Sequence, residues 1–340
     1  MLSLRARLVM FLTCCSFYCY SEPVKNLTLV TMKKGDKETL GVKTDKGILD
    51  VESANKALNQ SVPTDVMAII KKGDQSLKNL VDEALKSNNA SLFKNEAEIT
   101  FGPSVTNPGK IICVIVNNKA HAAGLAKNVY GKPPTPSPLK IPAGNYFSKF
   151  SNTVNSHKGT IEVSKYMPER FRFDHEIELV VVMGKKGFKI PESEALNHVY
   201  GYTIGNDFSE RSIGVEFFNM PPVAHKQLTL FKTLDGFAPM GPYLVSADQV
   251  SNPNDLKMEL FVNGEKKQSD TTANYTINIQ KVIADLSGIM TLEPGDVIFM
   301  GTPAGTIYDS QPFDKAVWLK PGDHIRSTIE GLGVLEFDLK

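Results

Sequence analysis

Residues 174–184 read DHEIELVVVMG, a short run of acids followed by apolar side chains. The β-branched part predicts a buried strand, and side chains alternate between the two faces of a strand. Glu176 and Glu178 therefore share one face, with His175 and Ile177 on the other. Two carboxylates so close repel each other, and burial adds a further cost unless a cation lies between them. Taken alone, the pattern fits a metal site and a solvated strand end with alternating charge equally well.

A second predicted strand supplies a third carboxylate. Residues 200–207 read YGYTIGND, so Asp207 stands where an apolar strand meets a loop. Three carboxylates with room for water and substrate suit Mg²⁺ or Mn²⁺ in octahedral geometry. Zinc fits less well, because the six histidines are scattered without ligand spacing and Cys113 is the one cysteine beyond the first 21 residues. The sequence therefore predicts one Mg²⁺ or Mn²⁺ ion held by these three acids.

The rest of the chain divides into two parts with different patterns. Residues 26–95 hold strand and hairpin patterns followed by helical spacing, which predicts a small N-terminal α+β domain. From residue 108 to residue 340, many short apolar runs alternate with glycine and proline. Short strands separated by turns predict a larger, mainly β domain. The predicted fold class is thus α+β, mainly β.

Charge and composition exclude one class of partner. The 340 residues include 38 Lys and Arg against 37 Asp and Glu, a formal net charge of +1. A nucleic-acid-binding protein would show a basic excess or a basic stripe, so we expect that this protein does not bind nucleic acid.

The first 21 residues are typical of a processing signal. Arg5 and Arg7 precede an uncharged apolar run, residues 8–20, that is too short to span a bilayer comfortably. This pattern predicts a signal peptide over residues 1–21 and a secreted or periplasmic protein, with no membrane attachment after cleavage. The alternative is a mitochondrial presequence, which also contains arginine and few acids but is usually amphipathic.

Four motifs in order make the chain similar to a known family. They are EIELVVVMGK (176–185), GYTIGNDFSER (201–211), KTLDGFAPMGP (232–242) and LEPGDVIFMGTPAG (292–305). They resemble the successive signatures of the fumarylacetoacetate hydrolase family, and the N-terminal part resembles the small first domain of many bacterial-type members. The resemblance covers nearly all of the chain beyond its first residues. It implies that residues 108–340 form the family's rolled, mixed β-sheet domain.

The resemblance also implies roles for individual residues. By motif position these are the metal ligands Glu176, Glu178 and Asp207, the catalytic residues His121 and Lys232, and the substrate-binding residues Lys149, Gly301 and Thr302. A lysine beside three carboxylates would stay protonated and stabilise a developing oxyanion. The turn at Gly301 and Thr302 would hold a substrate carboxylate through its amides and hydroxyl. Without the motifs, Lys232 would pass for a surface lysine and this turn for an ordinary Gly/Pro turn.

One motif departs from the family. Many members read NYxxHxxE, with the His and Glu forming a base dyad on a short helical lid, whereas residues 117–124 read NNKAHAAG here. His121 is kept, but Gly124 replaces the acid that would lie one helical turn away and orient it. Glycine also weakens a helix by roughly 1 kcal/mol relative to alanine. We therefore expect Gly124→Glu to raise acylpyruvate hydrolysis, unless Glu210 or Glu216 reaches His121 instead.

These observations predict a Mg²⁺- or Mn²⁺-dependent hydrolase that cleaves a carbon–carbon bond in a small oxo-acid, such as an acylpyruvate or a fumarylacetoacetate-like compound. The alternatives are an oxaloacetate-type decarboxylase or a hydroxy-dienoate isomerase, which need the dyad less. A degenerate, non-enzymatic member is a further alternative, against which the complete set of acids argues. The resemblance also implies a homodimer, with Phe217, Phe218 and Met220 either at its interface or in the core.

Overall fold

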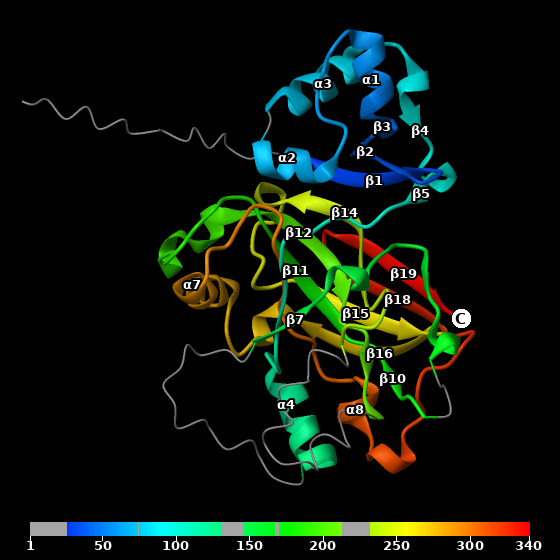
Figure 1. The fold of residues 1–340 in the computed structure, drawn as a ribbon, viewed down its shortest axis with the longest axis vertical. Coiled ribbons are helices and arrows are strands. Elements are labelled where there is room, and N and C mark those ends of the chain that lie inside the picture. The colour runs from blue at the N-terminus through cyan, green and yellow to red at the C-terminus, as the bar shows by residue number, and fades with distance from the viewer. Residues whose placement is uncertain (1–25, 74, 131–145, 167–169, 213–231) are drawn as a thin grey trace, which may run out of the picture.

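The computed structural model in Figure 1 describes residues 26–73, 75–130, 146–166, 170–212 and 232–340. Three groups of residues singled out in the sequence lie outside these ranges: the predicted signal peptide, Glu216, and the apolar residues Phe217, Phe218 and Met220. Within the described part of the chain, no helix is long and apolar enough to cross a membrane.

A large mixed sheet of twelve strands forms the centre of the structure. Its neighbouring strands, in order, are β4 (Phe93–Lys94), β3 (Gly47–Asp50), β2 (Lys37–Thr44), β1 (Thr28–Lys34), β14 (Ala238–Ser246), β12 (Val199–Asn206), β11 (Ile177–Met183), β17 (Val297–Phe299), β6 (Ile111–Val114) and β7 (Tyr146–Lys149). Two further strands join this path, β5 (Thr100–Phe101) beside β1 and β8 (Val154–Ser156) beside β14. Most pairs are antiparallel, but β17 with β6 and β14 with β8 are parallel.

A smaller sheet packs beside the large one. It has the order β16 (Glu265–Thr271), β15 (Lys257–Val262), β18 (His324–Ile329), β19 (Gly333–Leu339) and β9 (Gly159–Ile161). A short pair of strands, β10 (Phe173–Asp174) and β13 (Ser209–Glu210), completes the strand set of the described residues. The α+β, mainly β class predicted from the sequence is confirmed, and the strands of the described residues form no closed barrel.

Helices cover one side of the large sheet and one end of the molecule. The α-helices are α1 (Val51–Leu58), α2 (Val66–Lys72), α3 (Gln75–Lys86), α4 (Lys119–Leu125), α7 (Ile279–Ile289) and α8 (Ile307–Ser310). The remaining helical segments are the π-helical turn Ala126–Tyr130 and the 3₁₀ segments Ala90–Leu92, Glu96–Glu98, Ser151–Thr153, Val163–Lys165, Glu192–His198, Ala247–Gln249, Thr272–Asn274 and Phe313–Lys315. In Figure 1, α1, α2 and α3 lie over β1, β2 and β3, while α4 and α8 lie together at the opposite end.

Strand β11 shows why the large sheet forms the middle layer. All seven of its residues are buried, as the predicted buried strand requires. Leu179 and Val181 pack into the core shared with the small sheet, whereas Val180 and Val182 pack into the core beneath the N-terminal helices. The acids at the start of this strand are therefore carried by one of the most enclosed elements of the protein.

The N-terminal part shares the large sheet with the rest of the chain. Strand β1 pairs with β14, with Thr28 opposite Val245 and Leu29 opposite Leu244. Leu29 also belongs to the same apolar core as Phe299, which lies in the part of the chain from 108 to 340. The boundary between 26–95 and 108–340 stays a prediction, and the two parts are joined by backbone pairing as well as by the linker.

Candidate active site

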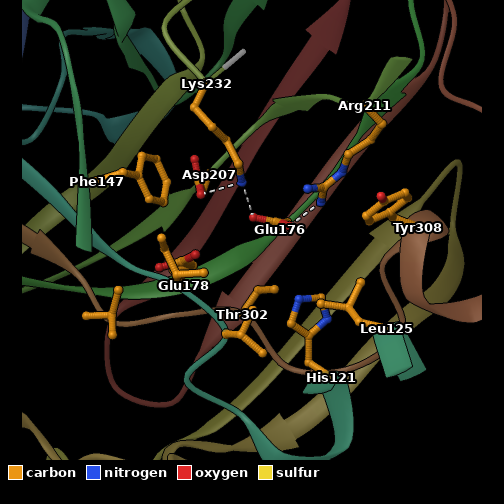
Figure 2. Close-up of a pocket in the computed structure, with 13 residues that line it drawn as sticks. His121, Leu125, Phe147, Glu176, Glu178, Asp207, Arg211, Lys232, Thr302 and Tyr308 are labelled. Carbon is orange, nitrogen blue, oxygen red and sulfur yellow. Dashed lines mark hydrogen bonds and ion pairs between the residues drawn. The ribbon is translucent and has the colours of Figure 1, made fainter. Parts of the chain in front are cut away.

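The three predicted acids converge at one end of the large sheet. Glu176 directly precedes β11, Glu178 lies on it, and Asp207 directly follows β12. The antiparallel register brings these positions together, and the Asp207 amide donates to the Glu176 carbonyl over 2.8 Å. One carboxylate oxygen from each acid lies within 4.8 Å of the others, and all three residues are buried. Figure 2 shows the three side chains facing one pocket.

Two cations lie against this group of acids. The Lys232 ammonium is 2.6 Å from a carboxylate oxygen of Glu176 and 2.6 Å from one of Asp207 (Figure 2). Arg211 pairs with Glu176 and, over 3.0 Å, with Asp174. Burial acts to raise the pKa of Glu176, but the charges of Arg211 and Lys232 outweigh it and hold that pKa below its usual value. Burial likewise acts to lower the pKa of Lys232, and the adjacent acids outweigh it, so the lysine stays charged.

Glu178 lacks such a partner. Among the described residues no lysine or arginine forms an ion pair with it, and it accepts one hydrogen bond from the Gly301 amide over 2.6 Å. Burial, and then the charges of Asp207 and Glu176, raise its pKa well above the usual value. A buried acid in this position is most easily kept ionised by a cation. The three acids offer the hard oxygen ligands that Mg²⁺ and Mn²⁺ prefer, so the residues present fit such an ion.

The predicted substrate turn follows β17. Gly301 has a backbone φ of +99°, and a β-carbon there would lie 2.7 Å from that of Asn117, so only glycine fits. Its amide is already used by Glu178, which leaves it unavailable for a substrate carboxylate. Thr302 lines the pocket, and its hydroxyl accepts a hydrogen bond from the Gln268 side chain over 2.8 Å. That hydroxyl can therefore donate its own hydrogen towards a bound acid.

His121 has a carboxylate partner that the sequence did not reveal. It lies on α4, whose first turn is capped by Asn118, and its Nδ1 is 2.6 Å from a carboxylate oxygen of Asp309 on α8. Both side chains are buried, and Asp309 is held in turn by the Gly305 amide and the Ser310 hydroxyl. The two partners are 188 residues apart, so no spacing rule in the sequence points to Asp309. An acid at this place orients the ring and leaves Nε2 for chemistry.

These residues enclose a small pocket of about 100 Å³. Its polar wall is made by the acids, Lys232, Arg211 and Thr302, and its apolar wall includes Val114, Leu125 and Phe147. His121 and Tyr308 border it on the side of the two short helices (Figure 2). The arrangement can hold a small, negatively charged molecule between a histidine and a charged lysine.

Comparison with known proteins agrees with this geometry. Residues 110–340 match the model of the fumarylacetoacetate hydrolase C-terminal family. The chain belongs to the fumarylacetoacetate hydrolase family. A mitochondrial oxaloacetate tautomerase of Bos taurus is 33% identical, over 92% of this chain and 92% of that protein. The similarity to enzymes named for oxo-acid reactions supports enzyme activity on oxo-acids.

Solved structures of the family share the fold. The fumarylacetoacetate hydrolase from Exiguobacterium antarcticum has a TM-score of 0.71 and 26% identity, covering 92% of this chain and 99% of that one. Maleylpyruvate hydrolase from Sphingobium sp., solved with manganese(II) and pyruvate, has a TM-score of 0.68 and 24% identity, with coverage of 92% and 98%. The rolled mixed-sheet architecture implied by the motifs is therefore confirmed.

The predicted secretion is wrong. Several family members similar to this chain over most of its length, such as the bovine protein, are named as mitochondrial enzymes, which does not agree with a secreted or periplasmic protein. The error has a physical source. An uncharged, largely apolar run after two arginines is common to more than one kind of targeting segment, so it does not separate a signal peptide from a presequence.

The expectation that His121 lacks an acid is also wrong, and Gly124 has a different role. A β-carbon at position 124 would lie 2.8 Å from the backbone oxygen of Asp309 and 2.9 Å from its β-carbon. Glycine is required because Asp309 already occupies the space that a side chain at 124 would enter. Glu210 does not replace the family's acid either, since it accepts hydrogen bonds from Arg172 and Ser212.

Gly124→Glu should therefore lower both stability and activity. Overpacking against a backbone oxygen typically costs about 1–3 kcal/mol in the free energy of unfolding. The measurement is urea unfolding together with kcat/KM, with Gly124→Ala as the control. In an unobstructed helix the alanine variant would gain roughly 1 kcal/mol, so a stabilised Gly124→Ala would show that the steric conflict is absent.

Lys149 is placed differently from a substrate-pocket lysine. Its side chain has no exposed surface, and its ammonium lies 2.7 Å from Asp207 and within hydrogen-bond distance of the carbonyls of Phe208 and Phe237. Burial lowers its pKa, and the charge of Asp207 offsets this in part. Lys149 thus contacts the back of Asp207 rather than the pocket, and we expect it to hold this acid in position.

Lys149→Met should destabilise the protein without a specific change in KM. Removing one partner of a buried ion pair costs roughly 3–5 kcal/mol. Because Asp207 would then keep only Lys232 as a cationic partner, a bound cation would compensate its charge further, and Mn²⁺ should raise the melting temperature more in this variant than in the wild type. Lys149→Arg, which keeps the charge, is the control. A variant of normal stability with a raised KM would support the original substrate-binding role.

Proposed function

We propose that this protein catalyses the keto–enol tautomerisation of oxaloacetate or a close oxo-acid analogue. The observation that carries the proposal is the small pocket with one proton-transfer residue, His121 held by Asp309, on one side and the charged Lys232 on the other. The bovine relative named as an oxaloacetate tautomerase supports the same reaction. Tautomerisation needs only a proton moved between C3 and the C2 oxygen, which matches this pair of groups.

The residues divide the reaction between them. His121 accepts a proton from C3 through Nε2, since Nδ1 is held by Asp309. Negative charge then builds on the C2 oxygen, and the Lys232 ammonium stabilises it. The Thr302 hydroxyl holds a carboxylate of the substrate. The Lys232 ammonium gives a proton to the C2 oxygen to complete the enol, and the proton taken from C3 leaves His121 to solvent while Lys232 takes one back. A Mg²⁺ or Mn²⁺ ion held by Glu176, Glu178 and Asp207 would supply a Lewis acid for the oxygens of the oxo-acid.

Carbon–carbon hydrolysis is the second candidate. The observation in its favour is the same His121–Asp309 pair, because a carboxylate-oriented histidine can also activate water. The absence of an acid at position 124 no longer counts against it. Oxaloacetate decarboxylation is a third outcome that the same assays detect.

Three assays on one preparation separate these activities. The purified protein with Mg²⁺ or Mn²⁺ is given enol oxaloacetate, whose disappearance follows tautomerisation, while pyruvate release reports decarboxylation and an acylpyruvate reports hydrolysis. We expect kcat/KM to be highest for tautomerisation. Faster acylpyruvate cleavage would establish the hydrolase instead, and dominant pyruvate release would establish the decarboxylase.

We also propose that the protein acts in mitochondria and as a homodimer. Arg5 and Arg7, with no acid among the first 21 residues, fit a presequence, and the bovine relative is mitochondrial. Fractionation of cells that express the full chain tests the location, and light scattering at micromolar concentration tests the assembly. A protein recovered in the secretory fraction, or a monomer, would contradict the respective part.

A further inference from the structure

A second cavity of about 530 Å³ lies behind the wall of the active site. The chain alternates between the two cavities at two places. Glu176 lines the active-site pocket while its neighbour His175 lines the second cavity, and Tyr308 lines the first while Ile307 lines the second. The second cavity therefore lies directly behind Glu176 and behind the α8 segment, which also carries Asp309.

The buried histidine at this wall has an unused polar atom. His175 is 1% exposed, and its Nδ1 faces the Gln268 side-chain oxygen over 3.2 Å. The Gln268 amide group donates to Thr302 and to the Pro303 carbonyl, so the side-chain oxygen is correctly placed as the acceptor. The hydrogen of His175 therefore sits on Nδ1, and Nε2 is a buried acceptor with no partner among the described residues.

The charges that line the cavity leave one cation available. Lys267 pairs with Glu265 over 2.8 Å, and Lys266 pairs with Glu259 over 2.7 Å. Asp323 accepts from the Asn263 side chain and from the Lys320 backbone amide. The exposed Lys320 side chain forms no ion pair with any part of the chain that the structure describes.

The rest of the lining is mixed, with an apolar part that includes an aromatic ring. Val262, Val317 and Leu319 contribute aliphatic surface, and Trp318 contributes its half-buried indole. The ring of Trp318 lies 5.1 Å from that of Phe313, measured between centroids, which holds it at the cavity rim. This apolar part of the wall can cover the body of a small molecule, while the polar groups around it fix its orientation.

We propose that this cavity is a second ligand site, which binds a small carboxylate with a flat apolar body. The carboxylate pairs with Lys320, and the apolar body packs against Trp318 and the neighbouring aliphatic side chains. His175 Nε2 accepts a hydrogen bond from a water beneath the ligand, since a carboxylate has no hydrogen to donate. The ligand would lie against the segment that holds Asp309 but would not enter the catalytic pocket.

The experiment uses the full chain and benzoate as the probe, with benzamide as the uncharged control. Trp318 is the only tryptophan in the sequence, so a change in intrinsic fluorescence reports on this cavity. We expect saturable quenching by benzoate and a much weaker effect of benzamide. Absence of saturable binding, or equal binding of the two probes, would overturn the proposal.

Two variants locate the site. Lys320→Met should weaken benzoate binding about tenfold or more, as expected for loss of a hydrogen bond to a charged group. Lys267→Met removes a lysine that is already paired with Glu265 and should have a smaller effect. His121→Ala should leave binding unchanged, because it alters the catalytic pocket alone. Binding that survives Lys320→Met, or that is lost in His121→Ala, would place the probe elsewhere and overturn the proposal.

Discussion

Glu178→Gln is expected to abolish tight Mn²⁺ binding and to reduce oxo-acid turnover by roughly a hundredfold to a thousandfold, the rate equivalent of several kcal/mol of lost electrostatic stabilisation. Glu178 is the one acid of the three that has no cationic side chain paired with it among the described residues. Of the three acids, Glu178 therefore depends most on a metal ion to stay ionised. Calorimetric titration with Mn²⁺ measures the binding directly, without relying on activity.

In the absence of metal, the same substitution is expected to stabilise the protein rather than impair it. Glutamine removes a buried group that is repelled by Asp207 and Glu176, so the metal-free variant should unfold at a higher temperature than the metal-free wild type. Addition of Mn²⁺ should stabilise the wild type and not the variant. Wild-type Mn²⁺ affinity in Glu178→Gln would contradict the proposed site, whereas a loss of binding caused by misfolding would show as a lowered melting temperature.

His121→Ala is expected to lower kcat by roughly a hundredfold to ten-thousandfold, the usual contribution of a positioned acid–base group. Asp309→Ala should lower it by a smaller factor, because the ring keeps its place on α4 but loses the carboxylate that orients it. If the two residues act as one unit, the double variant should be no slower than His121→Ala alone. The measurement is kcat and KM for all three proteins on the substrate that the assays identify.

Asp309 also holds the Gly305 amide, so its removal needs a control for structure. Ser310→Ala removes a different partner of the same carboxylate and leaves His121 and Asp309 in contact, so it should retain most of the activity. Losses that simply multiply in the double variant would mean that Asp309 supports the fold rather than His121.

The acids could be predicted because their signals are local. Alternation along one strand places Glu176 and Glu178 on the same face, and the end of the next strand places Asp207 beside them. Lys232 and the Gly301 turn followed from motifs whose residues are adjacent in sequence. The same reasoning predicted a mainly β chain from short apolar runs, which the structure has.

The sequence could not predict contacts between distant segments. Asp309 reaches His121 from the far end of the chain, and the reason for Gly124 appears only once Asp309 is placed beside it. Lys149 has a motif position near the substrate, but the direction of its side chain depends on the carbonyls of Phe208 and Phe237. In each case the deciding partner lies in a segment that the motif does not include.

The strand pair β1–β14, which joins the N-terminal part to the rest of the chain, affects how the protein unfolds. A chain that lacks residues 26–95 would expose one edge of β14 where Leu244 and Val245 now have backbone partners. It would also uncover the apolar side chains that now pack beneath α1, α2 and α3. Unpaired edges beside bare apolar surface promote association between chains. The two parts should therefore melt in a single cooperative transition, and the larger part expressed alone should aggregate.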